Sequence, residues 1–241
     1  MKRILLGVAI FSITLSSCHD GWFGHRIRGN GNVVTETRDI KNFDAIDVSA
    51  GIDVYVKQEP SESVKVETDA NIQEYIITEV KDGVLYIHPA SNTSLNTTGE
   101  IKVYVSAKNF KRFEASSAAD IIGESKILSD SEIFIKASSS ADVQLDIKSP
   151  KLSSDISSGA SVNLTGETKD FSVEASSGSS AKCFELMSEN TKVQVSSGAN
   201  ADVFASVNIS GKASSGGSID YKGNAASIVE TSSGGTVSKA N

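Results

Sequence analysis

The residues Ala175-Ser176-Ser177-Gly178-Ser179-Ser180 are one copy of a six-residue motif that recurs through the second half of the chain, and this recurrence indicates the fold. The first serine of each copy falls at positions 116, 138, 157, 176, 196, 214 and 232, so successive copies are 18 to 22 residues apart. A period of this length, kept over seven copies, indicates a solenoid of stacked repeats.

Alternating apolar residues flank each copy of the motif. Phe171, Val173 and Ala175 precede one copy, and Ala181 and Cys183 follow it. Alternation with a period of two residues is typical of β-strands. A strand, a sharp corner, a second strand and a longer return make one coil of a parallel β-helix, with about 19 residues per coil.

Individual positions of the motif suggest roles in the corner. Glycine at the fourth position suits a residue with positive φ, and a small polar side chain at the sixth can hydrogen-bond to the backbone of its own turn. The same frame occurs earlier, as Val48-Ser49-Ala50-Gly51-Ile52-Asp53, so we expect the N-terminal half to belong to the same solenoid in a less regular form. The predicted structural turn residues are Gly51, Asp53, Asp120, Asp142, Gly159, Gly178, Gly198, Gly216 and Gly234.

The N-terminus has the pattern of a lipoprotein signal peptide. Basic residues Lys2 and Arg3 precede an apolar run from Ile4 to Leu15, which is too short to cross a bilayer, since that takes roughly 20 residues. Leu15-Ser16-Ser17-Cys18 resembles the bacterial lipobox, so Cys18 is the predicted lipidation site and the membrane the predicted partner of the anchor. An ordinary secretory signal with an incidental cysteine is the alternative. We therefore expect a lipid-anchored protein of the bacterial cell envelope, at the outer membrane.

These features divide the chain into four predicted parts. Residues 1–17 are the signal peptide, 18–32 a glycine-rich flexible tether, 33–113 an irregular part of the solenoid and 114–241 its regular repeats.

Charge and cysteine content exclude several classes of function. The formal charge of -7 becomes -9 when Lys2 and Arg3 are cleaved off, and an acidic chain is a poor partner for nucleic acid. With Cys18 lipidated, Cys183 is the single remaining thiol, so no disulfide can form within the chain. We expect Cys183 to be a small buried hydrophobe rather than a nucleophile.

The residues from Phe43 to Val54 add a specific family resemblance. Together with Gly83-Val84-Leu85-Tyr86-Ile87 and the later Ser-Ser-Gly repeats, they resemble the head GIN domain family of auto-transporter-adhesin-like proteins, over about residues 39–221. Asp53 stands where the family's name places asparagine, and this exchange keeps the turn chemistry. The resemblance implies an all-β, right-handed parallel β-helix of the pectin-lyase-like kind and a role in adhesion, without an established enzymatic activity.

Catalysis must be weighed because parallel β-helices often act on polysaccharides. Acid–base sites of that kind need convergent carboxylates, usually with Arg, Lys or His. The sequence has no histidine after His88 and no arginine after Arg112. We therefore expect no catalytic residue and no cofactor, with a polysaccharide lyase or hydrolase as the alternative.

The remaining polar and aromatic residues fit structural roles better than binding roles. Asp120 and Asp142 should lie close together in neighbouring coils, but later copies have Ser, Asn or Thr at that position, so turn capping explains more than a calcium site does. His19 and His25 are too loosely placed to predict a metal site. About one aromatic residue per coil is expected to form a stacked ladder in the core: Phe134, Phe171, Phe184, Phe204 and Tyr221. The leading hypothesis is an envelope-anchored, non-enzymatic adhesion or interaction protein that presents a solenoid surface to a glycan or protein partner.

Overall fold

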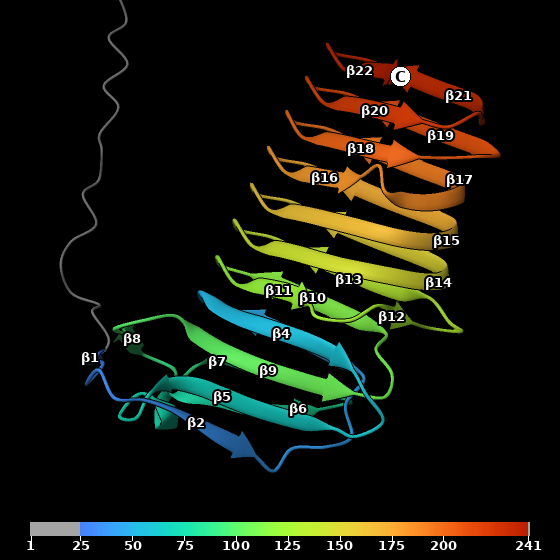
Figure 1. Cartoon of the computed structure of the whole chain (residues 1–241). Helices are drawn as coiled ribbons and strands as arrows, with labels where there is room; N and C mark the ends of the chain where they lie inside the picture. The colour runs from blue at the N-terminus through green and yellow to red at the C-terminus, as the bar shows by residue number, and fades with distance from the viewer. Residues whose placement is uncertain (1–24, 241) are drawn as a thin grey trace, which may run out of the picture.

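The structure, a computed structural model, describes residues 25–240 and is an all-β parallel solenoid (Figure 1). The predicted fold class is therefore confirmed. Each coil has two faces, which meet at a tight corner on one edge and at a wider bend on the other. Strands on face 1 precede a corner of the chain, and strands on face 2 follow it. Within the described residues, no helix is long and apolar enough to span a bilayer. The predicted signal peptide and Cys18 lie outside the described residues.

Face 1 is built by strands that precede the corners. From the N-terminal end of the solenoid these are β6 (Ile76–Lys81), β7 (Val84–Pro89), β3 (Ala45–Ser49), β10 (Arg112–Ser116), β13 (Ile133–Ala137), the second halves of β14 (Asp142–Ile156) and β15 (Ser161–Ala175), β17 (Leu186–Val195), β19 (Asn208–Ala213) and β21 (Ala226–Thr231).

Face 2 is built by strands that follow the corners. In the same direction these are β2 (Val33–Arg38), β5 (Ser63–Asp69), β9 (Ile101–Ala107), β4 (Ile52–Gln58), β11 (Asp120–Gly123), the first halves of β14 and β15, β16 (Ser180–Cys183), β18 (Asn200–Phe204), β20 (Ser218–Lys222) and β22 (Thr236–Lys239). The short β12 (Ile127–Leu128) pairs with β14 next to the bend.

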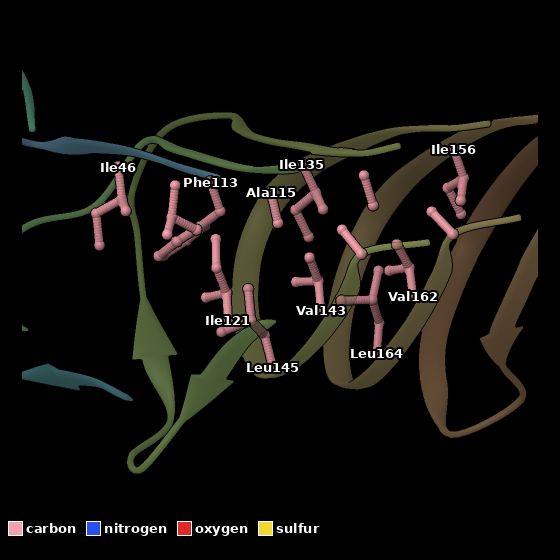
Figure 2. Close-up of a cluster of buried hydrophobic side chains, with 14 of the residues drawn as sticks. Ile46, Phe113, Ala115, Ile121, Ile135, Val143, Leu145, Ile156, Val162 and Leu164 are labelled. Atoms are coloured by element: carbon pink, nitrogen blue, oxygen red, sulfur yellow. The ribbon is translucent and has the colours of Figure 1, made fainter. Parts of the chain in front are cut away.

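The core lies between the two faces and is filled by the inward residues of each strand. Ile46, Phe113 and Ile135 come from face 1 and are in register on three neighbouring coils, while Ile121 and Val143 face them from face 2 (Figure 2). All five are 0–1 % exposed. Because burying one such side chain contributes about 1.5–3 kcal/mol, the inward alternation fixes both the strand register and the stack.

The corners have the left-handed backbone that the motif predicts, at two positions rather than one. The motif glycines from Gly159 to Gly234 have φ between 71° and 77°, and the serine before each of them has φ between 49° and 55°. Gly51 has φ 67°. Two successive residues with positive φ are typical of a type I′ turn, which is closed here by bonds such as Ala160 N–H to Ser157 O, 3.1 Å.

Hydrogen bonds also connect each corner to the next one. The Gly159 amide donates to Ser177 O and the Gly178 amide to Ser197 O, both at 3.1 Å. These backbone groups of the corners are therefore hydrogen-bonded within the protein, and the pairing between coils continues around the edge.

The N-terminal part joins the solenoid out of chain order. Strands β3 and β4 form a coil that lies between the coil of β7 and β9 on one side and the coil of β10 and β11 on the other. Antiparallel strands close this end: β6 pairs with β7, β5 pairs with β9, and β2 pairs with β5. The expected irregular N-terminal half of the solenoid is thus a true set of coils with an antiparallel cap.

The described chain is ordered before the predicted end of the tether. His25–Arg28 forms β1, which pairs in parallel with β8 (Thr93–Asn96), and the side chain of Ile27 is buried. Nearby lies the 3-10 helix η1 (Gln73–Tyr75). The buried carboxylate of Asp69 accepts bonds from the Gly31 amide (2.6 Å) and from the amide and hydroxyl of Thr98 (3.0 and 2.8 Å). Residues 25–32, which the sequence analysis placed in the flexible tether, are thus attached to the cap through Ile27 and Asp69.

Candidate functional site

Three aspartates from the corner motif stand one above another at the start of face 2. Asp53 pairs in register with Asp120, which pairs with Asp142. Burial raises the pKa of Asp120 and the charge of Asp142 raises it further, while burial and then Asp120 raise the pKa of Asp53. Among residues 25–240, no group of three or more His, Cys, Asp or Glu side chains could hold a metal ion.

Later coils carry uncharged residues in the same column. Here the hydrogen bonds run from coil to coil, from Asn200 Nδ2 to Ser180 Oγ (3.0 Å) and from Thr236 Oγ1 to Ser218 Oγ (3.1 Å). The corner backbone is bonded to itself and to neighbouring corners, so these two side chains link coils instead of capping their own turns. The column is therefore a row of surface side chains with one member from each coil.

The expected core ladder of aromatic residues is wrong for three of its five members. Phe171 is buried and Tyr221 packs against the core, but Phe134, Phe184 and Phe204 are half-buried on the outer surface. Phe134 and Phe204 follow the inward residues Ile133 and Val203, so the two-residue period turns them outward. Cations cover two of these rings, with Arg112 over Phe134 at 5.6 Å and Lys222 over Phe184 at 4.8 Å.

The bends carry a second periodic row, which the sequence analysis missed. Ser149, Thr168 and Ser188 are in register on successive coils and are all buried. Ser149 Oγ donates to Lys151 O (3.0 Å) and Thr168 Oγ1 to Asp170 O (3.3 Å), so each hydroxyl closes its own bend. With Ser129 and Ser206 the row has the same period as the corner motif, a signal that is present in the sequence.

A groove of about 740 Å³ runs along these bends. Its lining comes from residues 129–130, 148–150, 167–169, 187–189, 204 and 206, and we call it the bend groove. A second hollow of about 670 Å³ continues from it towards the cap and shares Ser129, Asp130 and Lys148. Together they make one elongated concave edge.

Both apolar and charged side chains line the bend groove. Phe204 and Pro150 lie in the lining, and the side chain of Met187 is 45 % exposed. Lys148 and Glu167 form an ion pair across two coils, with 2.9 Å between Nζ and Oε2. The remaining charged lining residues are Asp130, Lys169 and Glu189, so both signs are present.

The remaining candidate reactive groups are the thiol of Cys183 and the histidine side chains. Cys183 is buried, and burial raises the pKa of its thiol to about 12, which keeps it protonated. His88 lies on β7, with Nδ1 2.8 Å from Pro89 O, and His25 begins β1. His19 lies outside the described residues.

Several solved structures have the same fold. A Bacteroides fragilis protein described as a "putative adhesin" has a TM-score of 0.82 and 17 % identity, covering 89 % of this chain and 100 % of its own. A "putative lipid binding protein" from Parabacteroides distasonis has a TM-score of 0.73 and 22 % identity, covering 90 % and 100 %. A "putative adhesin" from Parabacteroides merdae has a TM-score of 0.72 and 20 % identity, again covering 90 % and 100 %. At these identities the likeness shows the fold.

The family assignment comes from the sequence. No curated protein matches the chain. The family described as "Putative auto-transporter adhesin, head GIN domain" matches residues 42–225, which is most of the chain. This chain therefore belongs to the head GIN domain family.

Proposed function

We propose that this protein is a non-enzymatic adhesion or interaction module of the bacterial cell envelope, which carries a lipid on Cys18 and binds its partner through the bend groove. The observation that carries the proposal is the groove itself, a concave surface that crosses five successive bends and combines Phe204 and Met187 with charged residues of both signs. Such a mixture of exposed apolar and polar side chains is typical of recognition surfaces.

Family and fold support the same reading. The family and two of the three neighbours are described as adhesins, and one neighbour as lipid binding. Two or more acyl chains on Cys18 would hold the protein stably at a membrane, since each buried CH₂ contributes about 0.8 kcal/mol.

The anchor and the adhesive role are tested separately. Cells producing the full chain should carry it in the membrane fraction, and Cys18→Ser should release it or block its processing. Cells with the wild-type chain should adhere to an immobilised glycan array or to matrix proteins better than cells without it. Normal processing and membrane retention of Cys18→Ser would overturn the anchor, and equal adherence of the two cell types would overturn the adhesive function.

The enzymatic alternative predicts a different result. A polysaccharide lyase or hydrolase would turn over uronic-acid or neutral polysaccharides and would lose that turnover in one of Asp120→Ala, Asp142→Ala or Asp155→Ala. We expect no turnover by the wild-type protein. Turnover that one of these changes abolishes without loss of stability would replace the adhesion proposal with the enzymatic one.

A further inference from the structure

We propose that the bend groove is a binding site for a linear polysaccharide of uncharged sugar units, lying along the solenoid axis with about one sugar unit per coil. This inference rests on the proposed adhesion function and names the chemistry of its partner.

The first argument is the repeat of the groove. Ser149, Thr168 and Ser188 are in register, so the bends follow one another at the spacing of neighbouring strands, about 4.8 Å. This spacing is close to the length that one sugar unit adds to an extended glycan chain. A polymer along the bend edge (Figure 1) would therefore meet equivalent positions of successive coils with successive units.

The second argument is the apolar surface at the C-terminal end of the groove. Phe204 turns its ring outward, the side chain of Met187 is 45 % exposed, and Val207, next to the groove, is 51 % exposed. The C–H face of a sugar ring packs well against an aromatic ring and against a polarisable thioether. In contrast to Phe134 and Phe184, Phe204 has no cation over its ring among the described residues.

The third argument is the charge pattern. Carboxylates accept hydrogen bonds from sugar hydroxyls and ammonium groups donate to them, and the rim offers Asp130, Glu189 and Lys169 for this purpose. Lys148 is already paired with Glu167. An anionic polymer would need a surplus of positive charge that the groove lacks, so uncharged units fit best.

The fourth argument excludes the addition of a peptide strand. That mode of binding needs a free strand edge with unpaired backbone groups. At the groove, β14 and β15 have strands on both sides, and the hydroxyls of Ser149 and Thr168 occupy bend carbonyls. The groove therefore offers side chains rather than free backbone groups, and this suits the binding of a glycan.

The test is affinity electrophoresis of the full chain, purified in detergent, in gels containing soluble galactomannan, hydroxyethylcellulose or xylan, with polygalacturonate and dextran sulfate as anionic controls. At least one neutral polysaccharide should retard the protein more strongly than either anionic one. Met187→Ala and Phe204→Ala should each weaken that retardation, the pair by on the order of tenfold in apparent Kd. Phe134→Ala is the matched control, because it removes a half-buried outer phenylalanine from face 1, outside the groove.

Thermal unfolding of every variant separates loss of binding from loss of folding, and Met187→Ala, at an exposed position, should leave the melting temperature unchanged. Equal retardation of wild type and groove variants, retardation by anionic polymers alone, or no retardation at all would each overturn the glycan site. If cells still adhere while any of these holds, the adhesion function stands and the groove assignment falls; if adherence is also absent, both fall.

Discussion

Adding a single methyl group to two different glycines should have very different consequences. Gly178 occupies a corner, with φ 72°, and a Cβ added there would meet no atom within 4 Å. Gly166 lies in β15, outside the motif, with φ 109°. A Cβ added there would overlap the carbonyl oxygen of Ile147 and come within 2.9 Å of its carbon.

The magnitudes follow from these environments. Gly178→Ala should lower the free energy of unfolding by about 1 kcal/mol. An alanine in the left-handed region costs about 1–2 kcal/mol, and the smaller conformational freedom of alanine in the unfolded chain offsets part of that cost. Two earlier coils support this estimate, since Ala118 and Ser140 occupy the same motif position with φ 60° and 63°. Gly166→Ala combines a strained φ with a backbone overlap, each worth about 1–3 kcal/mol, and should cost about 3–5 kcal/mol.

Thermal unfolding followed by circular dichroism distinguishes the two cases. For a domain of this size, 1 kcal/mol corresponds to about 2–4 °C, so Gly178→Ala should lower Tm by about 3 °C and Gly166→Ala by about 10 °C or more. Gly178→Val, with a β-branched side chain, should fall between them. Equal losses at the two glycines, or a larger loss at Gly178, would refute the corner and bend geometry on which the reasoning depends.

Three further predictions concern the buried side chains of Asp69 and Cys183 and the half-buried side chain of Asp120. Asp69→Ala should lower the free energy of unfolding by about 2–4 kcal/mol and speed hydrogen exchange at the Gly31 and Thr98 amides, because the Asp69 carboxylate accepts hydrogen bonds from both. Hydrogen bonds lower the pKa of Asp69, so its contribution to stability is present above the ordinary pKa of an aspartate and is lost as the pH falls through the lowered value. Unchanged exchange at these two amides would contradict this role of Asp69. Asp120→Asn should stabilise the protein at pH 7 by less than about 1 kcal/mol, because burial and the charge of Asp142 raise the pKa of Asp120, so its ionised form destabilises the fold above that pKa. Urea unfolding at a pH below the ordinary aspartate pKa should show no gain, and a loss of stability at pH 7 would point to a bound cation. Cys183 should resist iodoacetamide in the native state and react only after unfolding, because it is buried with a thiol pKa of about 12, and rapid native labelling would show that the core opens there.

The regular coils could be predicted from the sequence because two signals agree there. The Ser-Ser-Gly corners set the period, and the alternation on either side, as in Val162 and Leu164, sets which side chains point inward. Together they fix the register, since a slip of one residue would turn the core outward. The same parity rule, applied to Ile133-Phe134-Ile135, would have placed Phe134 on the surface.

Other features had weaker signals or none. The bend row Ser149, Thr168 and Ser188 is periodic, but single hydroxyl residues in a serine-rich chain stand out less than a six-residue motif. The place of β3 and β4 between later strands could not be predicted, because alternation shows that a segment is a strand and says nothing about which strand lies beside it. The early start of the fold at β1 depends on contacts between His25–Arg28 and Thr93–Asn96, which are far apart in the sequence.

The out-of-order coil of β3 and β4 limits how the gene for such a protein can change in length. From β13 onwards each new coil lies on the one made just before it, so a tandem duplication or deletion of one period adds or removes one coil and leaves a continuous stack. The coil of β3 and β4 has neighbours from β7 and β9 on one side and β10 on the other, so losing its codons would open a gap between segments encoded much later. Descendants of this sequence should therefore vary in length through their C-terminal coils and keep the first 120 or so residues intact.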